Sequence, residues 1–337
     1  MGGEIMATME DVAKAAKVSR ATVSRVLSNS SVVKSETSRK VMYWVKKLGY
    51  EPNKLAQSLA GNHSGIIGVI VPNITNPFYS ASVESIEEAA SEEGYNIIIC
   101  CSNRSKEKED RYIKDLRSRK VDGIIIYPVG VDNIERFSKY NFPIVSIGKK
   151  IEGRSAVLSD LEGGAALIAK HFLELGHKKI GYIGPTEAPK NYNKYAGFKQ
   201  YLDNNNISLN QIITYIPSEN NNSIELIIKD YIKRNGMNCS AWFADNDLSA
   251  IELMKVLQGE GYSIPDDVII AGYDNTLISE VSNPKLTSVY QPLKELGKES
   301  IKILINNILE VDTSERNINF ENKLIVRDST IKNYEFK

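Results

Sequence analysis

The stretch "VSRATVSRVL" (residues 18–27) places an arginine-bearing helix near the start of the chain. Its apolar residues recur at helical spacing and would form the buried side of that helix: Val23, Val26 and Leu27. Arg20, Ala21 and Arg25 then fall on the opposite face. Ser19 directly precedes the helix, and its hydroxyl can accept a hydrogen bond from an amide of the first turn. The pattern predicts a helix that begins at Arg20 and presents two arginines.

A preceding helix is predicted where apolar and alanine residues again follow helical spacing: Val12, Ala13, Ala16 and Val18. Only "KVS" (17–19) separates the two segments, which is typical of a helix-turn-helix. In that motif the N-terminal end of the second helix meets base edges in the major groove, where arginine pairs with guanine. Ser19 and Thr22 would bond phosphates. The alternative is that the arginines only solvate an amphipathic helix.

Two further segments extend this head. Residues 35–48 carry one apolar stripe, which predicts a third helix that covers the first two and places Trp44 in the core: Val41, Trp44, Val45 and Leu48. In "EPNKLAQSLAG" (51–61), Pro52 suits the start of a helix with a short apolar face at Leu55, Ala56 and Leu59. So short a helix is not stable alone. A symmetric partner and DNA would order it, with Leu59 pushed between base steps of the minor groove.

Charge is unevenly distributed along the chain. The 337 residues carry 42 Lys and Arg against 42 Asp and Glu, but the first 61 residues hold ten basic and five acidic residues, which leaves +5 there and −5 on the remainder. A basic head on an acidic body is typical of a nucleic-acid-binding module attached to a regulatory domain, although a solvated basic face would give the same count.

Several function classes find no support in the composition. Cys100, Cys101 and Cys239 lack the spacing of a disulfide framework or a zinc site, and no histidine is paired with carboxylates at ligand spacing. We therefore expect no metal and no cofactor. No secretory leader and no apolar run of about 18 residues occurs, so we expect a cytoplasmic protein without a membrane segment. No Walker loop, GxGxxG motif or nucleophile elbow occurs, and we expect no catalytic residue.

From Gly65 onward, β-rich apolar runs alternate with amphipathic stretches. The first series contains "GIIGVIV", "NIIICC", "GIIIYP" and "PIVSIG", with helices predicted over residues 79–93, 106–120 and 132–140. The alternation begins again at "SAVLSD" and continues through "KIGYIGP", "QIITYIP", "SAWFAD" and "DVIIAGYD", before a last helix over 292–309 and the strand "NKLIVRDS". This repetition predicts two α/β lobes, each a doubly wound parallel sheet with helices on both faces.

Open α/β sheets bind ligands at the carboxyl ends of their strands, so two lobes would hold a ligand in the cleft between them. The candidates are the polar and aromatic residues that follow strands: Asn73, Asn76, Phe78, Tyr79, Asp160, Lys194, Asn246, Asp247 and Asp274. Amides and carboxylates suit a hydroxyl-rich ligand, and an aromatic ring suits the apolar face of a sugar. Asn and Asp in such places are also common turn residues and N-caps, as Asn246 or Asp247 would be for the helix near Leu248.

The segments "MATMEDVAKAAKVSRATVSRVLS" and "LGYEPNKLAQSLAG", together with the body, closely resemble the lactose/galactose repressor (LacI/GalR) family of bacterial transcription regulators across nearly the whole chain. The resemblance places base-reading positions at Arg20, Ala21 and Arg25, and minor-groove hinge-helix positions at Asn53, Ala56 and Leu59. It places effector positions at Lys194, Asn246 and Asp274, and it leaves Asp160 and Asp247 with structural roles.

Four departures from the family pattern bear on these assignments. Lys17 stands where the family often has glycine, which costs about 1 kcal/mol if the residue is left-handed. Lys34 replaces a capping serine, so Ser35 would shift the cap by one residue. Lys194 replaces an arginine, and a flexible ammonium lacks the planar bidentate fork. Gly148, followed by two lysines, replaces an aspartate of sugar-binding members, which leaves open an anionic effector or a solvated loop.

The resemblance implies an α/β protein with an N-terminal all-α helix-turn-helix head, a hinge helix and two doubly wound parallel-sheet lobes resembling a periplasmic-binding-protein fold. The expected boundaries are 1–51 for the DNA-binding domain, 52–64 for the hinge and linker, and 65–337 for the effector-binding and dimerisation domain, with lobe one at about 65–160 and 290–319 and lobe two at about 161–289 and 320–330. No leucine heptads follow the last helix, so we expect a homodimer.

The function implied is that of a sequence-specific repressor of a carbohydrate-utilisation operon, which binds a pseudopalindromic double-stranded DNA operator and responds to a small effector, a sugar or a sugar phosphate. The effector could release the operator or strengthen its binding. Two alternatives are a sugar-binding transport component, for which the basic head would have no purpose, and an α/β enzyme, which no constellation of nucleophile and base supports.

Overall fold

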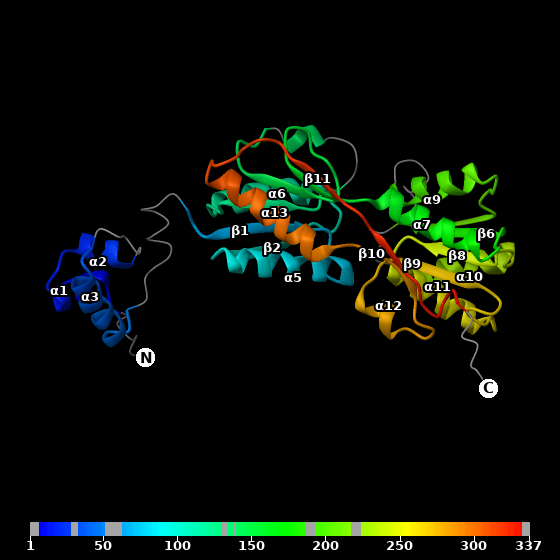
Figure 1. Ribbon diagram of the computed structural model, residues 1–337, viewed down its shortest axis with the longest axis horizontal. Helices are drawn as coiled ribbons and strands as arrows, with labels where there is room; N and C mark the ends of the chain where they lie inside the picture. The colour runs from blue at the N-terminus through cyan, green and yellow to red at the C-terminus, as the bar shows by residue number, and fades with distance from the viewer. Residues whose placement is uncertain are drawn as a thin grey trace. The chain divides into compact units, whose positions relative to one another are not determined.

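The computed structural model describes residues 7–27, 33–50, 63–129, 134–137, 139–185, 193–216 and 224–331. The chain divides into two compact units, Met1–Ser64 and Gly65–Lys337 (Figure 1). The hinge-helix prediction, with Asn53, Ala56 and Leu59, lies outside the described residues. Among the helices that are described, none combines the length and the apolar character needed to cross a membrane.

Three helices form the described part of the first unit: α1 (Met9–Ala16), α2 (Arg20–Leu27) and α3 (Ser35–Lys47). Their inward residues form one small core: Val12, Ala13, Ala16, Val23, Val26, Val41 and Tyr50. The predicted helix-turn-helix is confirmed. Trp44 is only half-buried at the edge of this core. The prediction for Leu48 is wrong, because α3 ends before it and its side chain is 37% exposed, while Tyr50 turns inward instead.

Caps fix both ends of α1 and the start of α2. The Thr8 hydroxyl accepts from the Asp11 amide and the Asp11 carboxylate accepts from the Thr8 amide, which closes a capping box. Lys17 ends α1 in the left-handed region, at φ 52° and ψ 48°. Ser19 Oγ accepts from the Thr22 amide at 3.1 Å, which confirms the predicted cap of α2.

The start of α3 differs from the prediction. The helix begins at Ser35, so Ser35 is its first residue and cannot be its cap. Lys34 occupies the cap position, and its side chain makes no capping hydrogen bond because an ammonium has no acceptor.

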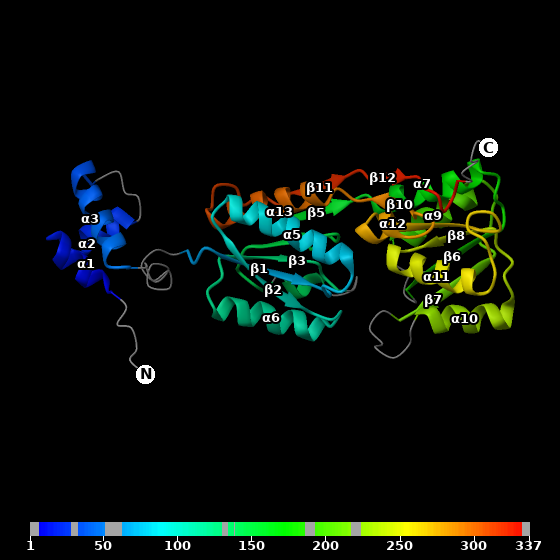
Figure 2. The same cartoon turned by 90° about the horizontal axis from the view of Figure 1, so that it is seen from below.

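The first sheet of the second unit has six parallel strands in the order β11-β5-β4-β3-β1-β2. The strands are β1 (Ile66–Val71), β2 (Asn96–Cys101), β3 (Gly123–Ile126), β4 (Ile144–Ile147), β5 (Ala156–Ser159) and β11 (Asn317–Phe320). Helices α5 (Pro77–Glu92) and α13 (Leu293–Ile308) pack on one face and α6 (Lys106–Ser118) packs on the other (Figure 2). We call this sheet and these helices the first lobe.

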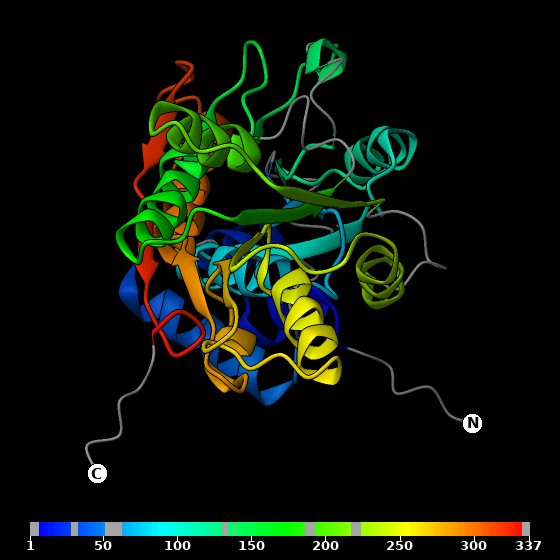
Figure 3. The same cartoon turned by 90° about the vertical axis from the view of Figure 1, so that its right-hand side faces the viewer.

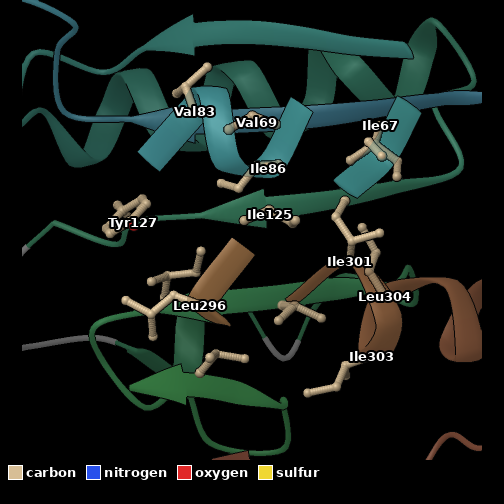
Figure 4. Close-up of a cluster of buried hydrophobic side chains, with 14 of the residues drawn as sticks. Ile67, Val69, Val83, Ile86, Ile125, Tyr127, Leu296, Ile301, Ile303 and Leu304 are labelled. Carbon is tan, nitrogen blue, oxygen red and sulfur yellow. The ribbon is translucent and has the colours of Figure 1, made fainter. Parts of the chain in front are cut away.

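The larger core of the first lobe lies between the sheet and the α5–α13 pair. Figure 4 shows Ile67 and Val69 of β1 and Ile125 of β3 facing Val83 and Ile86 of α5 and Leu296, Ile301 and Leu304 of α13. Because α13 begins only at Leu293, a segment from late in the chain completes a lobe that begins at β1.

The helix predicted over residues 132–140 is wrong in its described part. Ile134–Phe137 forms one 3-10 turn. The guanidinium of Arg154 donates to the carbonyl oxygens of Phe137, Tyr140 and Phe142. The Tyr140 amide also donates to the Phe137 carbonyl at 3.1 Å, so a turn and a side chain bind this segment in place of a continued helix.

The second sheet has the order β12-β10-β9-β8-β6-β7, and β12 is antiparallel to β10 while the other pairs are parallel. The strands are β6 (Ile180–Pro185), β7 (Gln211–Tyr215), β8 (Ala241–Ala244), β9 (Ile269–Asp274), β10 (Thr287–Tyr290) and β12 (Lys323–Ile325). Helices α7 (Leu161–Glu174) and α9 (Asn193–Asn204) pack on one face, and α10 (Ile224–Asn235) and α11 (Asp247–Gly259) pack on the other (Figure 3). With α12 (Leu277–Val281) they form the second lobe.

Helices α7 and α9 approach each other closely at Gly197. A Cβ atom added there would lie 2.2 Å from the carbonyl oxygen of Glu162. Only glycine permits this contact, and it fixes the start of α9, where the predicted ligand residue Lys194 lies.

Within the described residues, the chain passes three times between the lobes. It crosses from β5 to α7, from β10 to α13 and from β11 to β12, through residues 159–161, 290–293 and 320–323 (Figure 1). The strand β11 was not predicted from the sequence, because "NINF" is separated from "NKLIV" by a single residue and lacks its apolar run. These three crossings bring distant parts of the chain to the carboxyl ends of both sheets.

Candidate functional site

The exposed face of α2 carries the residues predicted to read bases. Arg20, Ala21 and Arg25 are exposed, whereas Val23 and Val26 are buried. Arg20 Nη1 lies 3.9 Å from a carboxylate oxygen of Glu10, and both side chains are more than half exposed. An ion pair of this kind contributes little, so the Arg20 guanidinium can exchange it for another partner.

The N-terminal end of α2 is polar and carries no acidic residue in its first turn. The hydroxyls of Ser19 and Thr22 lie 2.9 Å apart and bond to each other. A helix N-terminus without an acidic residue in its first turn favours an anion. Contact of Ser19 and Thr22 with phosphate stays a prediction.

The carboxyl ends of the second sheet bring together a buried ion pair. Lys194 Nζ lies 3.0 Å from Asp274 Oδ1, and both side chains are at most 7% exposed. The Lys194 ammonium also donates to the backbone carbonyl of Asp245 at 2.8 Å and lies 3.9 Å from the centroid of the Tyr273 ring. Gln291 Nε2 donates to the same Asp274 Oδ1 at 2.8 Å. Two predicted ligand residues are therefore in direct contact.

Burial and pairing act against each other on these ionisable groups. Burial raises the pKa of Asp274 to about 6, and the Lys194 ammonium opposes that rise. Burial lowers the pKa of Lys194, but Asp274, Tyr273 and Asp245 outweigh it, so the pKa of Lys194 is raised overall. Both groups are therefore charged at neutral pH, and Asp274 loses its charge on mild acidification.

The backbone at Asp274 is strained. Asp274 and Asn275 have φ angles of 103° and 47°, which are costly for residues with a side chain. The side-chain oxygen of Asn275 accepts from the Arg327 guanidinium at 2.8 Å, and the backbone amide of Asn275 donates to Ser288 Oγ at 3.0 Å. A strained segment that its surroundings hold in place is typical of a functional site.

Asp245, directly after β8, is the centre of a second network. Its Oδ1 accepts from the Tyr215 hydroxyl at 2.7 Å and from Asn246 Nδ2 at 3.0 Å. Asn246 Oδ1 accepts from the Ser249 amide at 2.9 Å and caps α11, which confirms the N-cap alternative for Asn246. Contact of Asn246 with a ligand stays a prediction.

Asp247 and Asp160 have the structural contacts expected of them. Asp247 accepts from the amide and hydroxyl of Thr276 at 2.7 and 2.9 Å and from the Ser288 hydroxyl at 2.5 Å. Burial raises the pKa of Asp247 to about 7, and Asp274 adds to that rise. Asp160 Oδ1 accepts from the Gly163 amide at 2.9 Å and caps α7.

The predicted ligand residues of the first lobe form a turn and an aromatic group. Asn73 Oδ1 accepts from the Asn76 amide, and Asn76 Oδ1 accepts from the Phe78 amide as the cap of α5, both at 2.9 Å. The rings of Phe78, Tyr79 and Tyr127 meet edge to face, with centroids 5.2 to 6.1 Å apart. The Tyr127 hydroxyl is hydrogen-bonded to Ser82.

The residues of the two lobes are close enough to affect one another's ionisation. Burial raises the pKa of Tyr79, and Arg104 and Lys194 oppose the rise while Asp274 and Asp245 add to it. Burial raises the pKa of Tyr127, and Asp274 contributes to that rise as well. Such effects require charges within a short range. Tyr79 and Tyr127 of the first lobe therefore lie within electrostatic range of Asp274 of the second lobe.

Sequence reasoning missed several residues that contact or act on the predicted ligand residues. Asp245 and Tyr127 directly follow strands in "ADND" and "IIIYP", so the signal that selected Asn246 also applied to them. Tyr215 ends a strand and Gln291 lies in a crossing, and neither belongs to a recognisable pattern. Arg104 follows β2 at a φ of 58°, and it was not singled out among the charged residues.

Other candidates have local partners. His171 Nε2 lies 2.9 Å from the Thr330 hydroxyl and His177 Nδ1 lies 2.8 Å from the Ser240 hydroxyl. Lys149 is half-buried and Lys150 is exposed after β4. Within the part of the chain that the structure describes, no group of three or more His, Cys, Asp and Glu side chains could hold a metal ion.

Comparison with known proteins gives two family matches. Residues 8–53 match the family described as bacterial regulatory proteins, lacI family, and residues 169–330 match the periplasmic binding protein-like domain. The chain is similar to the ribose operon repressor of Halalkalibacterium halodurans, at 32% identity over 96% of this chain and 97% of that protein.

Two solved structures extend the similarity. The Lac repressor dimer bound to operator and the anti-inducer ONPF has a TM-score of 0.86 at 26% identity, covering 97% of this chain and 99% of that one. A LacI family regulator from Enterococcus faecium with bound ribose has a TM-score of 0.69 at 31% identity, covering 79% of this chain and 98% of that one.

Proposed function

Because the chain belongs to the lacI family of bacterial regulatory proteins and is a DNA-binding transcriptional regulator, we propose that it represses an operon for carbohydrate use and that a neutral sugar controls its binding to the operator. The observation that carries the choice of a neutral effector is the Lys194–Asp274 pair. The Lys194 ammonium is already neutralised by Asp274 and does not need an anionic ligand. Family members are transcriptional regulators, and we propose no catalytic role for the site.

The proposal assigns residues 1–51 to operator binding, 52–64 to the hinge and linker, and 65–337 to effector binding and dimerisation. The exposure of Arg20, Ala21 and Arg25 on one face of α2 supports their role as base-reading residues. We propose a homodimer on a pseudopalindromic operator, because two identical heads require two half-sites related by a twofold axis.

The charges at the site favour a neutral ligand over a sugar phosphate. Asp245 and Asp274 face one ammonium from Lys194, and the first lobe adds Arg104, which acts on both Asp245 and Tyr79. Two unit charges of like sign 5 Å apart repel by about 3 kcal/mol at an effective dielectric constant of about 20. A phosphate would meet this repulsion from more than one carboxylate.

A sugar hydroxyl, in contrast, would gain acceptors. Among the described residues, the hydrogen bonds to the Asp274 and Asp245 carboxylates all end on Oδ1. We propose that the Oδ2 atoms accept from hydroxyls of the sugar, since hydrogen bonds to carboxylates are strong. The rings of Phe78, Tyr79 and Tyr127 would pack on its apolar face. Asn73, Asn76, Lys194 and Asn246 complete the proposed set of ligand residues.

Thermal unfolding with matched pairs of ligands tests the effector class. A ligand that binds only the folded protein raises its melting temperature. We expect a rise with D-ribose, D-xylulose or cellobiose, and none with ribose 5-phosphate or xylulose 5-phosphate. A rise with the phosphates alone would reject the neutral effector. No rise with any of the five would reject a sugar effector of this class.

Operator binding is tested with duplexes selected from a random pool by the full-length protein. We expect Arg20→Ala and Arg25→Ala each to weaken binding by about 1–3 kcal/mol and to relax base preference. Lys170→Ala, which removes an exposed cation from the second lobe, is the control and leaves affinity unchanged. Unchanged affinity in both arginine variants would contradict the assignment of α2. We expect Asp274→Ala to abolish the sugar response while operator binding persists.

A further inference from the structure

The three crossings are the only covalent connections between the two lobes in the described part of the chain. A change in the angle between the lobes must therefore alter the backbone at residues 159–161, 290–293 and 320–323. Side chains that bind both a crossing and the ligand site are placed to couple the two. Tyr273 and Gln291 meet this condition.

Asn322 joins the first crossing to the third. Its Nδ2 donates to the carbonyl oxygen of Asp160 at 2.9 Å, and its Oδ1 accepts from the Ser159 hydroxyl at 2.7 Å. The Asp160 amide donates to the carbonyl oxygen of Phe320 at 2.8 Å. Asn322 is buried, so these bonds are not in exchange with water. The first and third crossings are therefore bound to each other.

Tyr273 connects this junction to the ion pair. Its hydroxyl accepts from Asn322 Nδ2 at 2.8 Å and donates to the carbonyl oxygen of Leu161 at 3.3 Å. The face of the same ring lies 3.9 Å from Lys194 Nζ. Gly164 makes room for the hydroxyl, since a Cβ atom there would lie 2.4 Å from it. One buried, planar side chain thus contacts the junction at one end and the ammonium at its face.

Gln291 connects the remaining crossing to the same pair. It lies in the connection between β10 and α13, is 4% exposed, and donates to Asp274 Oδ1 at 2.8 Å. Lys194 donates to that same oxygen at 3.0 Å. The crossing at 290–293 therefore contacts the Lys194–Asp274 pair directly, and the other two crossings are connected to the pair through Tyr273.

We propose that Tyr273 and Gln291 are positioning residues that transmit occupation of the Lys194–Asp274 pair to the three crossings, and so set the angle between the lobes. The inference rests on the proposed function. A sugar hydroxyl that bonds to Asp274 weakens the hydrogen bonds at Oδ1, and the side chains of Lys194 and Gln291 then change position. Because the Tyr273 ring is fully buried, a shift of the ammonium at its face is carried to its hydroxyl and to Asn322. A ligand that fits one angle better then shifts the population of lobe angles.

The test separates effector binding from the response to it. Tyr273→Phe keeps the ring beside Lys194 and removes the hydroxyl, and Gln291→Met keeps the length of the side chain and removes the donor to Asp274. Each is compared, alone and combined, with wild type and with Tyr195→Phe, a tyrosine of the same aromatic cluster on α9. The readout is the ratio of operator dissociation constants with and without saturating D-ribose, D-xylulose or cellobiose, on the selected duplex.

For wild type we expect the sugar to change operator affinity by about 5-fold to 150-fold. In the combined variant we expect that ratio to fall at least about fivefold, while calorimetry still detects the sugar binding, and Tyr195→Phe retains the wild-type ratio. A purely structural role would lower the melting temperature and leave the ratio unchanged at temperatures well below unfolding.

The outcomes distinguish the two hypotheses. A wild-type ratio in the combined variant, with sugar bound, overturns the role of Tyr273 and Gln291 and leaves the proposed function intact. Wild-type protein that binds operator but responds to none of the three sugars rejects the proposed effector, and the inference with it.

Discussion

Replacing Lys194 with methionine tests whether its pair with Asp274 is buried and charged. The change keeps an unbranched side chain and removes the ammonium 3.0 Å from Asp274 Oδ1. Loss of one partner from a buried pair costs about 3–5 kcal/mol. Protonation sets an upper limit to this cost, because an unpaired Asp274 can take up a proton instead of remaining charged. With an ordinary pKa of 3.8, that uptake costs at most about 4 kcal/mol at pH 7.

The same reasoning gives a pH dependence. A carboxyl whose folded pKa lies above its unfolded value stabilises the fold at low pH, and this contribution is lost as pH rises through the folded pKa. In wild type, where the pKa of Asp274 is about 6, the loss between pH 5 and pH 7 is about 1.4 kcal/mol. In Lys194→Met the pKa of Asp274 rises further, and the loss of stability between pH 5 and pH 7 increases to at most about 2.7 kcal/mol. The stability difference between the two proteins therefore widens by up to about 1 kcal/mol.

Urea unfolding at pH 5, 6 and 7, at one protein concentration, measures this difference in stability. The probes are circular dichroism and the fluorescence of Trp242, which is fully buried in β8. The control is Lys194→Met/Asp274→Asn, which removes both charges. Its stability difference from wild type does not widen between pH 5 and pH 7. A cost below about 1 kcal/mol at pH 7, or a difference that is constant from pH 5 to pH 7, would refute the buried pair.

Three further predictions follow from local geometry. Gly197→Ala destabilises the protein by about 1–3 kcal/mol because the new Cβ atom meets the Glu162 carbonyl, whereas Gly259→Ala, at an open helical position, stabilises it by up to about 1 kcal/mol; equal urea midpoints would contradict both. Lys17→Gly relieves the left-handed end of α1 and stabilises the head by about 1 kcal/mol, while Ser19→Ala, which removes the cap of α2, costs about as much; melting of the head's helices, followed by circular dichroism, must move in opposite directions. Burial raises the pKa of Asp247 to about 7, so this carboxyl stabilises the fold fully below its unfolded pKa of 3.8, and the contribution is lost as pH rises through 7. The free energy of unfolding therefore increases by about 1 kcal/mol from pH 8 to pH 6. An Asp247→Asn variant with the same increase would exclude Asp247 as its source.

The local features of the head could be predicted because they depend on neighbours in sequence. The spacing of Val23 and Val26 determined the buried face of α2, and Ser19 capped it from three residues away. The prediction failed where the chain leaves a helix. Leu48 continued the apolar stripe of α3, but the helix ended at Lys47 and Tyr50 took the inward position.

The ligand site was predictable only in part, for a physical reason. Lys194, Asn246 and Asp274 follow strands, and parallel strands bring such residues to one edge. The bonds of Gln291 to Asp274 and of Asn322 to Tyr273 depend instead on where the crossings pass. Asn322 is 49 residues from Tyr273 in sequence and meets it only after both sheets have formed. No spacing rule in the sequence contains that information.

The late return of the chain to both sheets also governs how the body is completed during synthesis. The edge strands β11 and β12 both lie within Asn317–Ile325, and α13, which covers β3, β4 and β5, begins only at Leu293. A ribosome must therefore translate most of the message before either sheet has its full set of strands. Until then the nascent polypeptide exposes the apolar surface that α13 will cover, which makes it a substrate for chaperones and prone to aggregate.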